Sequence, residues 1–301
     1  MSTSPCPLCG STAHSPLVTG CRDYEYGVPY RAGYLLCETC GLARIDPLPS
    51  HEELTRFYPP DYANYSAPAS KLSRMLMAMY DSGVRRQASF FAPSGSRVLD
   101  VGCGGGHYLD KLAGKDLELH GTEFSEDAAR PARDKGHTVH VGALENLDLP
   151  PGHFRLIRLN HVIEHVLDPL ATLRAASRLL APGGAVVVET PNLHCPDFRL
   201  FGKYWGALHF PRHLHLFTLR TMGAAAEQAG LRVTKAVFTV MPTGWSLGLQ
   251  NLLAGTVGIR IANGRCALYP FFMLGFLPFA MLQKLARAGT MMQVHLTSVG
   301  S

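Results

Sequence analysis

The stretch that most constrains the fold is an apolar run that ends in a glycine-rich turn. Residues 97–106 read Arg-Val-Leu-Asp-Val-Gly-Cys-Gly-Gly-Gly, and a helix-like segment follows from Tyr108. Glycine adopts positive φ at little steric cost and lets a ligand approach the backbone, while the start of a helix offers free N–H groups. The pattern therefore predicts the first strand–turn–helix unit of a doubly wound sheet, with a ligand at the turn.

A second feature lies at the distance that such a fold requires. Leu117–Glu123 reads as a short strand that ends in an acid, 23 residues after Asp100. In doubly wound folds, a carboxylate at this position accepts hydrogen bonds from ribose hydroxyls. We therefore expect Glu123 to bind a ribose.

The order D-x-G-x-G-x-G differs from the G-x-G-x-x-G order of dinucleotide-binding folds. It resembles motif I of the class I S-adenosyl-L-methionine (SAM) methyltransferases, VLDxGCGxG. The resemblance implies that Gly102, Gly104 and Gly106 pack against SAM and that Asp100 orders the turn. It implies further cofactor contacts in and after the motif, at Cys103, Phe124, Leu144 and Asn160.

Strand-like and helix-like stretches alternate after motif I, and four separated motifs of the family occur in order over about residues 90–240. We predict strands near 97–101, 117–122, 138–141, 155–160 and 184–190, with a late pair near 231–240 and 291–298. The resemblance implies an α/β fold, the Rossmann-like seven-stranded sheet of the class I methyltransferases. We predict three parts: a zinc ribbon (1–45), a linker with N-terminal helices (46–92, including a helix at about 71–91) and the methyltransferase domain (93–301).

Two C-x-x-C-G pairs stand near the N-terminus, Cys6/Cys9 and Cys37/Cys40, separated by 27 residues. Two such knuckles are typical of a closed, tetrahedral four-thiolate zinc site. No charged-then-apolar leader precedes Cys6, so we expect a cytoplasmic protein in which a disulfide framework is disfavoured. We predict structural Zn²⁺ at these four cysteines.

Histidines gather after the expected fourth strand, in Asn160-His-Val-Ile-Glu-His-Val-Leu-Asp-Pro169. On a helix, His161, Glu164 and His165 would share one face. Read alone, H-x-x-E-H also matches one class of zinc peptidases, but the SAM-type strand before it disfavours that interpretation. A later cluster, Phe210-Pro-Arg-His-Leu-His, places His213 and His215 on one side of an extended segment.

The first histidine segment resembles the E-x-x-E-H segment of the ubiquinone-pathway O-methyltransferases and of the small-RNA 2′-O-methyltransferases. In those families the glutamates and histidines hold a divalent ion; here His161 replaces the first glutamate. The resemblance implies catalytic roles for His165, His213, Glu164 and His161. Either a histidine acts as general base, or a second divalent metal binds at Glu164, His165 and His213. Structural pairing of these side chains is the alternative.

We expect the segment from about 241 to 288 to form a hydrophobic helical insert before the last strand, and residues 266–283 carry no charge. Pro270, Gly275 and Pro278 interrupt it, which argues against a membrane-spanning helix. Two interpretations remain, an insert that covers the substrate or a lipid-facing surface of a peripheral membrane protein. Both predict an apolar substrate pocket.

The expected function is SAM-dependent transfer of a methyl group to an oxygen or carbon of a small-molecule acceptor, such as a lipid, quinone-like or sugar intermediate. The ribbon followed by a methyltransferase also resembles deoxysugar C-methyltransferases. An RNA methyltransferase that grips RNA with its ribbon is an alternative, disfavoured because the net charge is only +5 and no basic stripe is evident. A non-catalytic SAM-fold binding module is a third interpretation, disfavoured by the intact motif I and Glu123.

Overall fold

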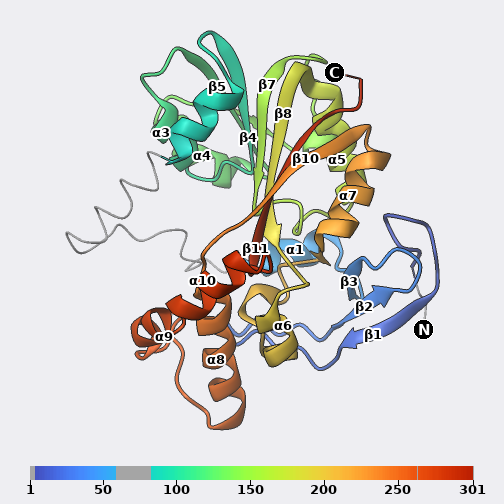
Figure 1. Cartoon of the computed structure of the whole chain (residues 1–301), viewed down its shortest axis with the longest axis vertical. Coiled ribbons are helices and arrows are strands. Elements are labelled where there is room, and N and C mark those ends of the chain that lie inside the picture. Colours follow the sequence, from blue (N-terminus) through green and yellow to red (C-terminus); the bar gives the residue numbers. More distant parts are fainter. Residues whose placement is uncertain (1–3, 59–82, 263, 301) are drawn as a thin grey trace.

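The computed structural model describes residues 4–58, 83–262 and 264–300. Its centre is a seven-stranded sheet in the order β10-β11-β8-β7-β4-β5-β6 (Figure 1). Five neighbouring strands are parallel, and β11 runs antiparallel between β8 and β10. The strands are β4 (Ser96–Val101), β5 (Leu117–Glu123), β6 (Thr138–Val141), β7 (Phe154–Asn160), β8 (Leu180–Pro191), β10 (Leu231–Phe238) and β11 (Met291–Ser298). The predicted seven-stranded α/β fold is confirmed, with strand limits within a few residues of those expected.

Helices cover both faces of this sheet (Figure 1). Because strand side chains alternate between faces, Val98 of β4 packs with Leu109 of one helical layer, while its neighbour Leu99 packs with Leu173 of the other. The first layer contains α3 (His107–Leu112) and α4 (Glu126–Asp134), and the second contains α5 (Pro169–Leu179) and α7 (Leu219–Gln228). Continuous apolar strands are what a parallel sheet buried on both faces requires.

The N-terminal region forms a second sheet, in the order β1-β2-β3-β9. Its strands are β1 (His14–Val18), β2 (Gly33–Cys37), β3 (Ala43–Asp46) and β9 (His215–Leu216). Arg44 of β3 pairs with His215 of β9, so the sheet takes its last strand from far downstream. Tyr34 and Ile45 are fully buried in a core shared with Trp205 and Leu214. The N-terminal sheet is therefore built into the body of the protein.

The segment after this sheet contains α1 (His51–Arg56). Ser50 and Glu53 form a capping box, in which each side chain accepts a hydrogen bond from the other residue's backbone N–H. The helix expected at about 71–91 is seen at residues 83–91, and its remainder lies outside the described residues.

The insert between β10 and β11 forms α8 (Thr243–Thr256), α9 (Tyr269–Gly275) and α10 (Leu277–Leu285) at one end of the molecule (Figure 1). Asp197 of α6 (Pro196–Phe201) holds it in place. This fully buried carboxylate accepts hydrogen bonds from Trp205 Nε1 (2.6 Å), Gln283 Nε2 of α10 (2.7 Å) and Thr290 Oγ1 (2.9 Å). Among the helices of the described residues, none has the length and apolar character to cross a membrane.

Short 3₁₀ turns complete the fold, namely η1 (Leu144–Asn146), η2 (Gly202–Tyr204) and η3 (Gly206–Leu208). The first of them is the only helical element in the connection from β6 to β7, all of which the structure describes.

Candidate functional site

The glycine turn after β4 has the left-handed backbone that its sequence predicts. Gly102, Gly104 and Gly106 have φ of +65°, +50° and +78°. A Cβ at Gly102 would lie 2.8 Å from Val162 Cγ2, and a Cβ at Gly106 would lie 2.8 Å from His137 Cδ2. A Cβ at Gly104 would meet no described atom within 4 Å. The outer glycines are therefore required by packing, while the middle one faces space that a ligand can enter.

Asp100 stabilises this turn from below. It is buried, and its Oδ1 accepts a hydrogen bond of 2.9 Å from Arg158 Nη1 on the neighbouring strand β7. The Arg158 guanidinium also lies 4.2 Å from the centroid of the Tyr108 ring. Burial raises the pKa of Asp100, and the charge of Arg158 opposes that rise. Sequence reasoning missed Arg158, although opposite charges directly across two neighbouring strands could have indicated the pair.

Glu123 closes the turn from the side of β5. Its Oε2 accepts a hydrogen bond from Gly104 N (2.9 Å), and its Oε1 accepts one from Phe124 N (2.8 Å). Each carboxylate oxygen has a second lone pair, so ribose hydroxyls can still donate to it. The carboxylate therefore lies where the sequence predicts, at the carboxyl end of β5 beside the open glycine.

The other predicted cofactor residues differ in what they can offer. The Cys103 N–H donates to Thr122 O (2.9 Å), which joins the turn to β5. Phe124 is exposed, and its ring stacks with that of His51. Leu144 is buried in the core, so only its backbone can face a ligand. Asn160 ends β7, opposite Glu189.

The histidine segment does not form the expected helix. Residues 161–165 form a turn in which the His165 N–H donates to Val162 O (2.8 Å) and His161 has φ of +54°. The helix α5 begins only at Pro169, because proline disfavours helical backbone at the residue before it. Asp168 then caps α5 by accepting hydrogen bonds from its first N–H groups. A turn, and not a helix face, brings the polar side chains together.

The turn places Glu164 beside histidines from two segments. Glu164 is fully buried, with its Oε1 3.3 Å from His161 Nδ1 and 3.9 Å from His213 Nε2. The rings of His165 and His213 meet edge to face, with centroids 4.6 Å apart. His215 lies apart from this group, with its Nε2 3.3 Å from Leu167 O.

The tautomers follow from the carbonyl partners. His165 Nδ1 lies 3.0 Å from Arg212 O, and His213 Nδ1 lies 2.8 Å from Ala207 O. A carbonyl oxygen can only accept, so each ring carries its proton on Nδ1 and presents the lone pair of Nε2. Glu164 Oε2 has no hydrogen-bond partner among the described residues. The acceptor atoms of Glu164, His165 and His213 therefore lie close together, within 4.8 Å of one another.

Burial sets the charges in this group. It lowers the pKa of His165 to about 4, although the Glu164 charge opposes the shift, and it lowers that of His213 well below its usual range. Burial alone would raise the pKa of Glu164, but the hydrogen bond from His161 and the nearby histidines outweigh it, so the carboxyl pKa is lowered. For His161, the hydrogen bond and charge of Glu164 outweigh burial and raise the pKa. At neutral pH, an ionised carboxylate thus faces two neutral imidazoles, which suits a divalent metal or a general base.

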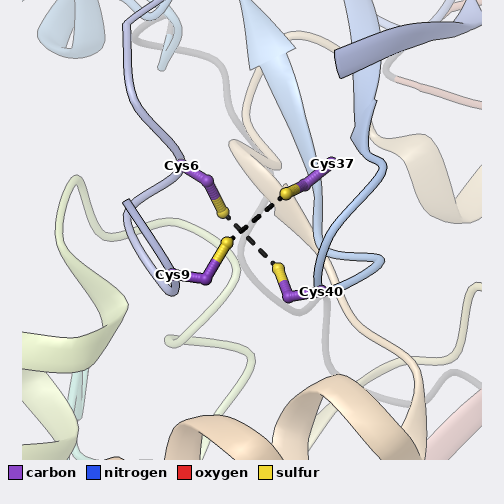
Figure 2. A group of neighbouring side chains, drawn as sticks. All are labelled: Cys6, Cys9, Cys37 and Cys40. Atoms are coloured by element: carbon purple, nitrogen blue, oxygen red, sulfur yellow. Dashed lines mark hydrogen bonds between the residues drawn. The ribbon is translucent and has the colours of Figure 1, made fainter. Parts of the chain in front are cut away.

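The four predicted cysteines converge from two knuckles (Figure 2). Cys6 Sγ lies 3.6 Å from Cys40 Sγ, and Cys9 Sγ lies 3.5 Å from Cys37 Sγ. All four sulfurs lie within 4.8 Å of one another. Zinc–sulfur bonds of about 2.3 Å place tetrahedral sulfurs about 3.8 Å apart. The cluster is therefore compatible with a zinc ribbon.

The N-terminal sheet also holds the loop that carries His213. The Tyr34 hydroxyl donates to His213 O (2.7 Å), and the Ile45 N–H donates to Leu214 O (2.8 Å). Arg212 and Asp23 form a fully buried ion pair of 2.9 Å. Tyr58 adds a contact from the linker, its hydroxyl 3.2 Å from His165 Nδ1. Sequence reasoning missed these residues because no local pattern links positions more than 100 residues apart.

Sheet order, glycine turn and Glu123 together define the class I SAM-dependent methyltransferase fold. A family described as a methyltransferase domain matches residues 76–236, about half of the chain, and the chain belongs to that family.

Relatives and solved structures agree with this assignment. The ubiquinone biosynthesis O-methyltransferase of Bordetella bronchiseptica is 32% identical over 154 residues, 47% of this chain and 64% of that protein. The enzyme of the same name from Aromatoleum aromaticum is 36% identical over 131 residues, 40% of this chain and 56% of that protein. The chain thus spans about half to two thirds of the length of these relatives. A SAM-dependent methyltransferase from Archaeoglobus fulgidus shares the fold, with a TM-score of 0.50 and 19% identity over 73% of this chain and 93% of that one.

The buried histidines predict a loss of stability in acid. His165 and His215 have pKa values of about 4 in the folded protein, whereas an exposed imidazole titrates near 6.5. The unfolded chain therefore binds more protons between these values, so this stability is fully present above pH 6.5 and is lost as the pH falls toward 4. We expect the free energy of unfolding to fall by about 1.4 kcal/mol per pH unit for each such imidazole in that window.

Urea unfolding at several pH values, at constant ionic strength, measures this slope. The variant His215→Asn should show a shallower slope than the parent, and the exposed His194→Asn should show the parent's slope. Equal slopes in all three proteins would contradict the assignment to His215.

Proposed function

We propose that the chain is a SAM-dependent methyltransferase that methylates an oxygen of a quinone-like small molecule. The observation that carries this proposal is the close approach of Val162 to the glycine turn, where a Cβ added to Gly102 would lie 2.8 Å from Val162 Cγ2, because it sets the histidine group beside that turn. The names of the relatives, which describe an O-methyl transfer in ubiquinone biosynthesis, support the same substrate class. Carbon methylation and sugar or lipid acceptors are less supported.

The turn after β4 and the end of β5 suit the cofactor. Bound SAM supplies a methyl group activated by its sulfonium. Glu123 accepts hydrogen bonds from the ribose hydroxyls. Gly104 lets the ligand approach the backbone, and the ion pair of Asp100 with Arg158 keeps the turn in place. Backbone groups near Leu144 edge the adenine. The main task of these residues is to align the methyl group with the acceptor, which can lower the activation barrier by several kcal/mol.

The histidine group can remove the proton of the acceptor hydroxyl. Nε2 of His165 or of His213 can take this proton, and the Glu164 carboxylate stabilises the imidazolium that results. The same three residues can hold a second divalent ion, which would lower the pKa of a hydroxyl bound to it. The unpartnered Glu164 Oε2 and the closeness of the three acceptor atoms favour that ion.

The four cysteines bind one structural zinc ion in this proposal, and the ribbon (1–45) with the linker (46–92) supports the domain at 93–301. The ribbon shares a buried core with residues of the methyltransferase domain, and Tyr34 holds the His213 loop by a hydrogen bond to the His213 carbonyl. An RNA-gripping role for the ribbon is therefore less supported.

The cofactor site is tested by calorimetric titration with S-adenosylhomocysteine. The change Glu123→Ala removes the acceptor of the ribose hydroxyls, and charged hydrogen bonds of this kind contribute about 1.5–3 kcal/mol. We expect binding to weaken about 10- to 100-fold. Glu126→Ala is the matched control, because it removes an exposed carboxylate from α4 nearby. Unchanged binding in Glu123→Ala would reject the assigned ribose site.

The chemistry is tested by transfer of a labelled methyl group from SAM to a catechol with a prenyl side chain. We expect His213→Gln to lower kcat about 10²- to 10⁴-fold and to leave the affinity for S-adenosylhomocysteine unchanged. His194→Gln should retain the parent's activity. If the parent binds the cofactor but methylates no catechol, the substrate class is wrong; if His213→Gln remains active, the role of the histidine is wrong.

We further propose that the insert contacts an anionic lipid surface. The helices α9 and α10 and the residue before them expose large apolar side chains, namely Leu268, Phe271, Leu274, Leu277, Phe279, Met281, Leu282 and Leu285. Exposed basic residues flank them, namely Arg260, Arg265, Lys284 and Arg287. The sequence has no Asp or Glu after Glu227. Apolar side chains flanked along the chain by basic residues suit an anionic bilayer, where a prenylated acceptor also resides.

Flotation with vesicles tests this surface. We expect the protein to float with vesicles that contain phosphatidylglycerol, and less with pure phosphatidylcholine, because each basic residue near an anionic surface contributes about 1 kcal/mol. Leu274→Glu, at a side chain that is 72% exposed, should abolish flotation. Val299→Glu, exposed near the distant C-terminus (Figure 1), should not. Equal flotation of both variants, or none of the parent, would reject the lipid contact.

A further inference from the structure

A second group of histidines and a carboxylate lies on the central sheet, nearer the amino end of β5 than Glu123. We propose that Glu118, His120 and His153 form a binding site for Zn²⁺, with the fourth position open to water. The methyl-transfer reaction uses none of these residues, so the proposal is independent of the function proposed above.

The fold exposes these side chains together. Glu118 and His120 are two positions apart on β5 and therefore project from the same face of the sheet. His153 immediately precedes β7. The connection from β6 to β7, which the structure describes throughout, contains only the short η1. As a result, Glu118 is exposed on this part of the sheet, and both histidines are partly exposed.

The ligand atoms lie close to the distances that zinc requires. The three residues each offer one atom, and these atoms all lie within 4.8 Å of one another. Glu118 Oε1 and His120 Nε2 are 2.9 Å apart. Zinc bonds of about 2.0–2.1 Å place tetrahedral nitrogen and oxygen ligands roughly 3.4 Å apart, so small side-chain shifts suffice. The part of the chain that the structure describes offers the His153 ring no hydrogen-bond partner, so its nitrogens remain available.

The neighbours of these residues support ligation. A metal-bound histidine usually donates its other ring N–H to an acceptor, and here His120 Nδ1 lies 3.2 Å from His140 Nε2 on β6. Ligating carboxylates are themselves held by hydrogen bonds, and here Arg97 Nε donates to Glu118 Oε2 at 2.7 Å. Arg97 thus holds one carboxylate oxygen and leaves the other directed at His120.

The donor set suits a divalent cation. One carboxylate and two imidazoles supply one oxygen and two nitrogens, the ligand types that zinc takes in sites with three protein ligands. The ion would link β5 to the start of β7 across β4.

Zinc titration by calorimetry at pH 7.5 tests the site, on full-length protein whose tightly bound zinc has first been counted. The variant His213→Gln is used as the parent here, so that the group around Glu164 cannot supply the binding measured. We expect one additional zinc site in this parent, lost when His153→Gln is added. His140→Ala, which removes only the partner of His120, should weaken the site about 10- to 100-fold. Addition of His194→Gln, which changes an exposed histidine elsewhere, should have no effect.

Cobalt absorption and cofactor binding complete the test. Co²⁺ should give a visible spectrum that disappears with His153→Gln, while that variant's affinity for S-adenosylhomocysteine and its circular dichroism stay unchanged. Absence of an additional zinc site in the parent would overturn the proposal. So would zinc binding that is equal with and without His153→Gln, since the cluster would then be only a hydrogen-bonded surface group.

Discussion

Glu164 is a fully buried carboxylate, and the arrangement of the site depends on stabilising its negative charge. His161 supplies a hydrogen bond to its side chain, and the Leu214 and His215 N–H groups both donate to its backbone carbonyl. These contacts join the turn after β7 to the segment that carries His213. A carboxylate that is only partly satisfied in this way attracts a proton donor or a cation, which is the property that an acceptor hydroxyl or a metal exploits.

The fold could be predicted from sequence because its signals are local and repeated. Val98, Leu99 and Val101 around Asp100 form a strand buried on both faces, and the three following glycines specify positive φ. Spacing alone then placed Glu123 at the end of the next strand. Such patterns need only the neighbouring residues to be interpreted, so the positions of the strands and of the glycine turn followed from them.

The sequence indicated which histidines and which glutamate to consider together, but not the geometry that brings them together. Glu164, His165 and His213 meet as expected, yet the turn that brings them together replaced a helix because Pro169 and Asp168 set the start of α5. Tyr34, Arg212 and Arg158 were missed because their roles arise from partners on other strands or segments. Long-range contacts of buried polar groups leave no periodic pattern in the sequence.

The pairing of β3 with β9 has a consequence for how the chain is made. Translation delivers the cysteines and β1 to β3 before β9, and the strand that completes their sheet begins about 170 residues after β3 ends. Until then, Ala43 and Ile45 lack their downstream neighbours, and the edge of β3 is open to other strands. A metal ion at the two knuckles, as proposed above, would hold the cysteine segments together during this interval of synthesis.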